Sequence, residues 1–171
     1  MKILLTILIL TLTLTACGAE PVLETIGDVP IQSVSAPAKQ IIVDLPDGSI
    51  TPAAGSTETG QLYICDDYVL TIVTAASGDL KKTVLDATGY TPEELQIIKT
   101  VQDTYDRYDT VWTAAGEEGQ QIGRLCILDD GSYHYVLTAM TAAEQAGKLQ
   151  PVWQDMFSSF RVTDENVNTG S

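Results

Sequence analysis

Basic residues are scarce in this sequence of 171 residues. Lysine and arginine together number 9, against 23 aspartates and glutamates, which gives a formal net charge of −14 at pH 7. A surface of this sign repels phosphate backbones and anionic lipid headgroups. We therefore exclude nucleic-acid binding and attachment to lipid through a polybasic patch. The charge is compatible with a cationic partner or a divalent ion, and equally with an acidity that serves only solubility.

Histidine is almost absent, since His134 is the only one. A His-rich metal site and an HExxH zinc site are therefore excluded. The Gly-x-Ser-x-Gly nucleophile motif is missing too, so a Ser-His-Asp triad has no supporting pattern. A hydrolase would need His134 within hydrogen-bond reach of a serine or carboxylate in a cleft. We expect no enzyme, name no catalytic, cofactor-binding or metal-ligating residue, and expect His134 to be a structural strand residue.

Three weaker patterns stay open as binding sites. The pairs Asp66-Asp67 and Asp129-Asp130 could together offer oxygen ligands to Ca²⁺, but no twelve-residue calcium loop is present, and turn chemistry also explains both pairs. Trp112 and Tyr108 could stack on a carbohydrate if their rings were exposed. The acidic, tyrosine-rich stretch around Arg107 could bind a cationic or aromatic ligand. For each pattern the simpler interpretation is a turn, a core ring or a solvated strand face.

The long apolar run lies at the N-terminus. Lys2 is followed by about a dozen apolar residues from Ile3 to Leu14, which is typical of a signal peptide and short for a membrane-spanning helix of ~20 residues. The run ends in Leu14-Thr15-Ala16-Cys17, which resembles a bacterial lipobox. That resemblance implies cleavage before Cys17, a diacylglyceryl group on its sulfur, and a location on the outer face of the cell membrane or in the envelope. The alternative is an ordinary signal peptide followed by a chance cysteine.

Cysteine is also rare, and only Cys65 and Cys126 remain after lipidation of Cys17. Both lie in apolar, strand-like sequence. An oxidising compartment would permit a disulfide between them, provided that their Cα atoms come within about 7 Å. Two buried free thiols are the more common outcome for such residues.

Composition divides the chain into four parts. Residues 1–16 are the signal peptide, and residues 17–38 are rich in Pro, Gly, Ser and Ala without periodicity, which predicts a flexible tether of roughly 25 Å. Residues 39–163 form one domain of ordinary apolar content. Residues 164–171 are polar and predict a disordered tail.

Alternating apolar patterns predict a mostly antiparallel sheet within 39–163. A short strand begins at Gln40, and "QLYICDDYVLTIVTA" predicts two strands around Asp66-Asp67, or one bulged strand. The segment Tyr68 to Val73 is apolar on both faces, which predicts a central strand covered on both sides. Three more strands follow, "DRYDTVWTAA", "QIGRLCIL" and "SYHYVLTAM", the last two joined by a hairpin at Asp129-Asp130-Gly131.

Two helices complete the pattern. "SGDLKKTVLDATGY" predicts a helix capped by Ser77, with Leu80, Val84 and Leu85 buried. Capping boxes are predicted at Thr91 to Glu94 and at Thr141 to Glu144. The stretch "LQPVWQDMFSSF" predicts a second helix, which Pro151 either starts or kinks. Its broad apolar face consists of Leu149, Val152, Trp153, Met156, Phe157 and Phe160.

The order strand, helix, antiparallel meander and helix, with "HYVLT" followed by an aromatic W…F…F helix, resembles the PsbP-like superfamily over about residues 39–163. The resemblance implies an α+β fold, an α/β/α sandwich with a mostly antiparallel sheet covered by helices. Known relatives include extrinsic proteins of the photosynthetic oxygen-evolving complex, a eukaryotic nuclear-transport factor and bacterial lipoproteins. They share a rigid sandwich that serves as a protein-binding or assembly module, mostly without catalysis, so the fold does not define one function.

Together these observations predict a non-catalytic, lipid-anchored extracytoplasmic protein that binds membrane lipid through its anchor and another envelope protein through its domain. Such a module predicts an exposed apolar or aromatic patch on one face. The alternative is a lipoprotein that binds a small ligand or a cation, which predicts a concave pocket of several hundred cubic ångströms with converging polar groups.

Overall fold

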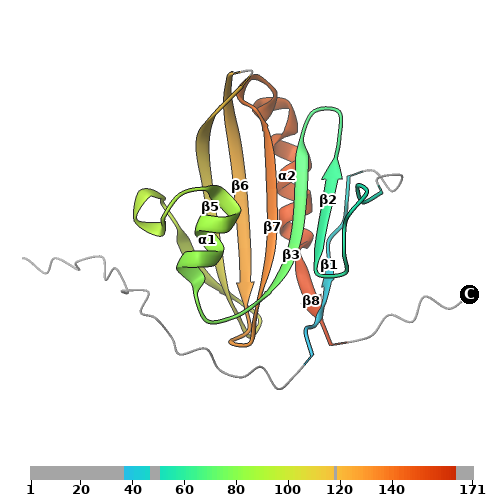
Figure 1. Ribbon diagram of the computed structural model, residues 1–171, viewed down its shortest axis with the longest axis vertical. Coiled ribbons are helices and arrows are strands. Elements are labelled where there is room, and N and C mark those ends of the chain that lie inside the picture. Colours follow the sequence, from blue (N-terminus) through green and yellow to red (C-terminus); the bar gives the residue numbers. More distant parts are fainter. Residues whose placement is uncertain (1–36, 47–50, 118, 165–171) are drawn as a thin grey trace, which may run out of the picture.

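A computed structural model describes residues 37–46, 51–117 and 119–164 of the chain (Figure 1). The predicted signal peptide, Cys17, most of the tether and all but the first residue of the tail lie outside these residues. Neither helix among the described residues is long and apolar enough to cross a membrane. The elements, in chain order, are β1 (Gln40–Ile42), β2 (Gly60–Ile64), β3 (Val69–Ala76), α1 (Leu80–Thr88), the 3-10 turn η1 (Pro92–Glu94), β4 (Ile98–Gln102), β5 (Tyr105–Gly116), β6 (Gly119–Asp129), β7 (Tyr133–Ala142), the 3-10 turn η2 (Ala143–Gln145), α2 (Ala146–Ser159) and β8 (Arg161–Thr163).

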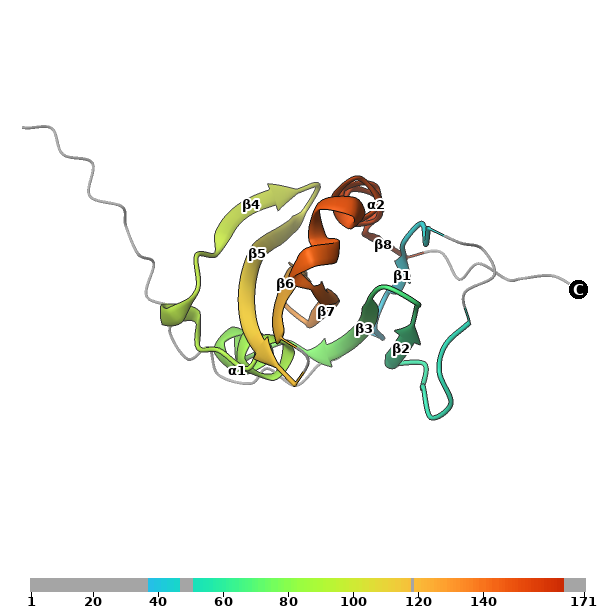
Figure 2. The same ribbon diagram turned by 90° about the horizontal axis from the view of Figure 1, so that it is seen from above.

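One six-stranded antiparallel sheet organises the fold, with strand order β2-β3-β7-β6-β5-β4. Helices α1 and α2 lie on opposite faces of this sheet (Figure 2). The predicted fold class, an α+β sandwich with a mostly antiparallel sheet covered by helices, is confirmed. The alternation of side chains along each strand divides the interior into two apolar clusters, one under each helix.

The larger cluster lies between the sheet and α2. The predicted aromatic face of α2 is correct: Trp153, Met156 and Phe157 are buried, and Phe160 is buried directly after the helix ends. These side chains pack against residues such as Leu70 and Leu137 from the sheet. Pro151 neither starts nor ends α2 but lies inside it.

The smaller cluster lies between the sheet and α1. Leu80 and Val84 are buried there as predicted, but Leu85 is 44% exposed because it points away from the sheet. The predicted cap at Ser77 is wrong, since Asp79 is the N-cap and its carboxylate accepts a hydrogen bond from the Lys82 amide. Helix α1 has only nine residues and ends at Gly89, which has a left-handed backbone conformation. The helix therefore covers only part of the sheet face on which it lies.

The two predicted capping boxes have different outcomes. The first forms as expected, with the Thr91 amide donating to Glu94 Oε2 over 2.8 Å, although it begins a single 3-10 turn. The second does not form, because the chain remains in β7 up to Ala142. The Thr141 hydroxyl instead donates to the carbonyl of Asp67 in the β2–β3 turn.

A second, two-stranded sheet pairs β1 with β8 and brings the two ends of the described chain together. The Lys39 amide donates to the Tyr135 hydroxyl over 2.9 Å, and its ammonium group pairs with Asp164. The Tyr135 hydroxyl in turn donates to Asp130 in the β6–β7 hairpin. Both ends of the described chain therefore lie at the hairpin end of the sandwich (Figure 1). The β1–β8 pair was not predicted, because three-residue strands carry too little periodicity.

Candidate functional site

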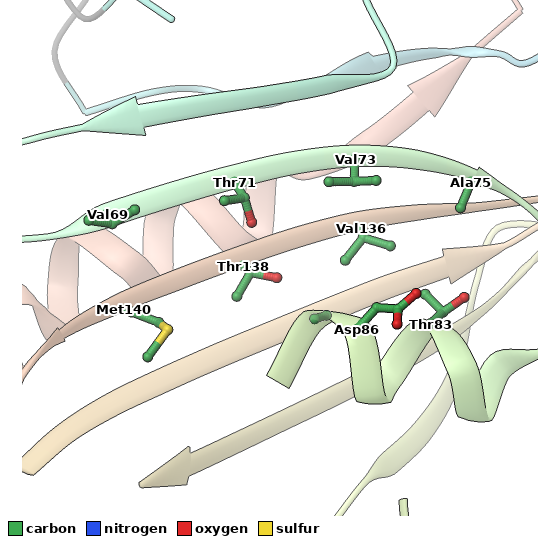
Figure 3. A pocket seen from close by; sticks show the side chains of 10 residues that line it. Val69, Thr71, Val73, Ala75, Thr83, Asp86, Val136, Thr138 and Met140 are labelled. Carbon is green, nitrogen blue, oxygen red and sulfur yellow. The ribbon is translucent and has the colours of Figure 1, made fainter. Parts of the chain in front are cut away.

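A groove of about 330 Å³ opens on the α1 face of the sheet, between the helix and strands β3 and β7 (Figure 3). Its lining is mostly apolar. The strands supply the floor with Val69, Thr71, Val73, Val136, Thr138 and Met140. Helix α1 supplies one wall, which includes Ala87 and Asp86.

The pairing register explains why these side chains lie together. Val69 is paired with Met140, Thr71 with Thr138, and Val73 with Val136. Residues directly opposite each other in an antiparallel pair lie on the same face of the sheet, and so does every second residue along each strand. The alternation of β3 therefore directs one set of its residues to α2 and the other set to the groove.

Strand β3 differs from its prediction on the groove side. Leu70 and Ile72 are buried under α2, as expected of a covered strand. Val69 and Val73 are 40% and 37% exposed, although the sequence predicts that both faces of this strand are covered. The difference arises because β3 lies second from the sheet edge, and the short α1 packs against β6 and β7 instead of β3. One apolar face of β3 is thus left open to solvent.

The open apolar surface continues onto the edge strand β2. Leu62 is paired with Thr71 and Ile64 with Val69, so both belong to the groove face. Leu62 is 37% exposed and Ile64 is 70% exposed. Contiguous exposed apolar residues of this kind mark interaction surfaces more often than singly scattered ones. We call the set Leu62, Ile64, Val69 and Val73, together with the groove, the open face.

Thr138 is the unusual polar residue of the groove floor. It is 5% exposed, and its Oγ1 atom is buried without a hydrogen-bond partner. A buried hydroxyl without a partner typically destabilises by about 1–3 kcal/mol, so such atoms are rare in native proteins. The groove therefore combines an apolar lining with one unsatisfied polar group.

His134 lies at the other end of β7, on the same face of the sheet, and is 1% exposed. Its Nδ1 is 2.8 Å from Thr83 Oγ1 in α1, and its Nε2 is 3.6 Å from Asp129 Oδ2 and 3.5 Å from Ser77 Oγ. The order hydroxyl, imidazole, carboxylate is that of an activated nucleophile. However, the imidazole is enclosed, and the Thr83 hydroxyl also contacts the Asp79 carbonyl within its own helix.

The contacts of His134 fasten α1 to the β6–β7 hairpin. Burial opposes ionisation of Asp129, but hydrogen bonds from His134, the Gly131 amide and Ser77 outweigh it and lower the pKa of this carboxyl. The predicted hairpin is present, with Gly131 at φ 82°. His134 is thus a buried strand residue near a hairpin end, as its sequence context indicates.

The two aspartate pairs do not come together. Asp129 and Asp130 lie at the hairpin where β7 begins, whereas Asp67 contacts Thr141 at the end of that strand. About eight residues of extended strand separate the two ends, which corresponds to roughly 27 Å. A shared Ca²⁺ site is therefore excluded. No cluster of three potential metal-ligating side chains occurs within 37–46, 51–117 and 119–164.

Cys65 and Cys126 are both free thiols. Cys65 follows edge strand β2 and Cys126 lies in β6, so three strand spacings, about 14 Å, separate them across the sheet. This is twice the Cα separation that a disulfide allows. The disulfide alternative is therefore wrong for this fold. Burial also raises the pKa of the Cys126 thiol well above its usual range, which makes it unreactive.

The structure supports neither carbohydrate stacking on Trp112 nor ligand binding by Arg107. Trp112 is 5% exposed and packs over Gly123, so it cannot offer a face to a sugar. The Arg107 guanidinium is occupied within the domain, because it pairs with Asp109 and donates to Gln102 Oε1. Sequence reasoning instead missed Thr83 and Thr138. The signal available for Thr138 was a hydroxyl between Val136 and Met140 on the same face of β7.

Neither a protein-family model nor a curated protein matches the sequence. Among solved structures, the chain is similar to the solution structure of cyanobacterial PsbP (CyanoP) from Synechocystis sp. PCC 6803. The identity is 15%, the match covers 80% of this chain and 100% of that chain, and the TM-score is 0.50. It is also similar to LpqN, involved in cell envelope biogenesis of Mycobacterium tuberculosis, with 14% identity, 74% and 84% coverage, and a TM-score of 0.47. The chain has a PsbP-like fold.

Proposed function

We propose that this chain is a non-catalytic, lipid-anchored extracytoplasmic module that binds another envelope protein through its open face. One observation carries the proposal: the apolar face of β3, predicted to be buried, is exposed beside α1 and continuous with exposed Leu62 and Ile64 on β2. A folded domain loses stability by leaving such a face in water, at roughly 25 cal/mol per Å². A partner that covers the face would recover this free energy.

The position of the chain ends supports an anchored arrangement. Lipidation at Cys17 would attach the domain to the membrane through the segment that precedes residue 37, and Lys39 lies at the hairpin end of the sandwich. The open face runs along the sheet from the β2–β3 turn towards this end. The flexible tether predicted from the sequence, of roughly 25 Å, would leave the anchored domain free to turn, so its open face can meet the extracytoplasmic part of a neighbouring protein.

A non-catalytic role agrees with the surroundings of the only histidine. The His134 ring is enclosed, and its two nitrogens face side chains of α1, of the preceding β6–β7 hairpin and of the β3–α1 connection. A general base must reach a substrate proton directly or through one water. We therefore assign His134 a structural role and propose no reaction.

The second candidate is a small-ligand-binding lipoprotein. The groove volume of about 330 Å³ lies at the lower end of the range for ligand pockets, and the Thr138 hydroxyl would supply one oriented polar contact. The first candidate is preferred because the exposed apolar surface extends beyond the groove onto Ile64, where a small ligand would leave it uncovered.

The test is site-specific photo-cross-linking in cells with the full-length chain. A photoreactive amino acid replaces Val69 on the open face, and in a matched variant replaces Gln154, which is exposed on the opposite side of the molecule on α2. We expect one dominant envelope protein cross-linked from Val69 and not from Gln154. The Cys17→Ala variant, which removes the anchor, should lose this product.

Two results would contradict the proposal. One is the same set of cross-linked proteins from both positions, which would indicate random collisions. The other is no protein product from Val69 together with retention of a small molecule by the purified chain in native mass spectrometry, which would favour the second candidate.

A further inference from the structure

The open face has the shape of a docking site for a helix and not for a strand. Strand addition requires free backbone groups at a sheet edge. At the β2 edge the Leu62 carbonyl accepts from the Ala53 amide over 2.6 Å, and the Leu62 amide donates to Ser56 Oγ. Thr57 and Gly60 form a further bridge. Most of this edge is thus already paired with the chain's own loop, which favours a partner that docks on the face.

The dimensions of the face fit a short helix. Val69 and Ala75 mark the two ends of the groove along β3, which corresponds to about 20 Å of strand. About 13 residues of α-helix have this length. Helix α1 forms one wall through the short side chains of Ala87 and Thr83, and small residues at a contact let two helices approach to about 8 Å.

The polar requirement of the site is specific. Thr138 Oγ1 is buried on the groove floor and lacks a partner. An apolar side chain placed over it would leave it unsatisfied, whereas a small hydroxyl or amide side chain would satisfy it.

The charge requirement follows from the whole chain, whose net charge is −14. Asp86 on the rim is paired with Lys82, so the attraction for a basic partner is a long-range effect of the acidic surface.

We infer that the open face binds one amphipathic α-helix of the partner protein, which lies alongside α1. The helix directs an apolar stripe to β3 and β7, places a small polar residue opposite Thr138, and carries lysine or arginine on its outer faces. This inference rests on the proposed function and specifies the partner's structure and chemistry.

The test uses three 14-residue lysine-rich peptides and the chain from Gly18 onward, which retains every described residue. The first peptide has a leucine stripe at helical spacing with one central serine. The second has the same composition without the stripe, and the third has alanine in place of the serine. Binding is measured by fluorescence anisotropy of the labelled peptides. We expect the first peptide to bind at least tenfold more tightly than the second and about threefold more tightly than the third.

Protein variants locate the binding and test the hydroxyl. Val69→Asp should weaken binding of the first peptide at least tenfold. Val111→Asp should change it less than twofold, because Val111 is an exposed strand valine on the opposite face. Thr138→Val should remove the preference for serine over alanine while the fold, monitored by circular dichroism, is retained.

Equal binding of the striped and scattered peptides would overturn the inference, as would equal effects of the two aspartate variants. A serine preference that survives Thr138→Val would also overturn it. These failures are distinguishable from failure of the proposed function. If Val69 cross-links an envelope protein in cells but the peptides bind without stripe dependence, the module binds its partner by another mode.

Discussion

Gly123 is the position where the structure makes its sharpest prediction about stability. It lies in the middle of β6, opposite Trp112 on β5, and the indole ring passes directly over its backbone. A Cβ atom added at Gly123 would lie 2.3 Å from Cζ2 and 2.4 Å from Cε2 of Trp112. Ordinary contacts between such atoms begin near 3.5 Å, so the ring or the strand must move by about 1 Å.

We expect Gly123→Ala to lower the free energy of unfolding by about 2–3 kcal/mol, in the upper part of the range for overpacked cores, because a rigid ring on a central strand has little freedom to move. For a domain of this size the midpoint of thermal unfolding should fall by roughly 6–12 °C. A urea titration measures the free energy of unfolding and a thermal melt measures the midpoint, each followed by circular dichroism and by the fluorescence of Trp112 and Trp153.

Gly147→Ala is the matched control. Gly147 lies in α2 with no atom within 4 Å of an added Cβ, so alanine should stabilise the chain by about 0.5 kcal/mol through helix propensity. A double-mutant cycle adds a second check: in a Trp112→Leu background the effect of Gly123→Ala should largely disappear. If the free energy of unfolding of the Gly123→Ala variant lies within 0.5 kcal/mol of that of the unchanged chain, Trp112 does not pack over Gly123 as proposed.

Three further predictions concern the hairpin and the thiols. Thr83→Val should lower unfolding stability by about 1–2 kcal/mol, because the buried imidazole loses its partner, whereas Thr100→Val on an exposed strand should have little effect in the same urea titration. The pKa of Asp129 is lowered on folding, so its stabilisation is complete above about pH 5 and is lost as the pH falls. Asp129→Asn should therefore destabilise at pH 7, with a difference that shrinks at pH 3. In the Cys17→Ala variant, the half-buried Cys65 should react with a thiol reagent in the folded protein, whereas Cys126 should react only after unfolding. Equal rates for the two native thiols would contradict the burial of Cys126.

Much of the fold could be predicted because side-chain periodicity is a local property. The alternation in β5, β6 and β7, the glycine at the Asp129-Asp130-Gly131 turn and the aromatic stripe of α2 each specify their element without reference to the rest of the chain. The errors arose where a local signal competes with a distant partner. Thr141 matches a capping box, yet the Asp67 carbonyl takes its hydroxyl and the strand continues.

The candidate site was predictable only in part. The sequence showed that Val69 and Val73 are apolar and share a face, and alternation alone would have both faces of β3 buried. Which face is covered depends on where β3 lies in the sheet and how long α1 is, and both are decided by pairings between distant segments.

The sequence by itself determined the acidic charge, the scarcity of histidine and cysteine, and the residues that share each strand face, because composition and a two-residue period need no partner. Only the tertiary structure decided that the aspartate pairs lie at opposite ends of β7 and that two strands, β3 and β7, lie between Cys65 and Cys126. It also decided that His134 is enclosed by α1 and that the open face lacks a cover. The physical reason is that periodicity specifies which side chains point the same way, whereas strand order and helix placement specify what they meet.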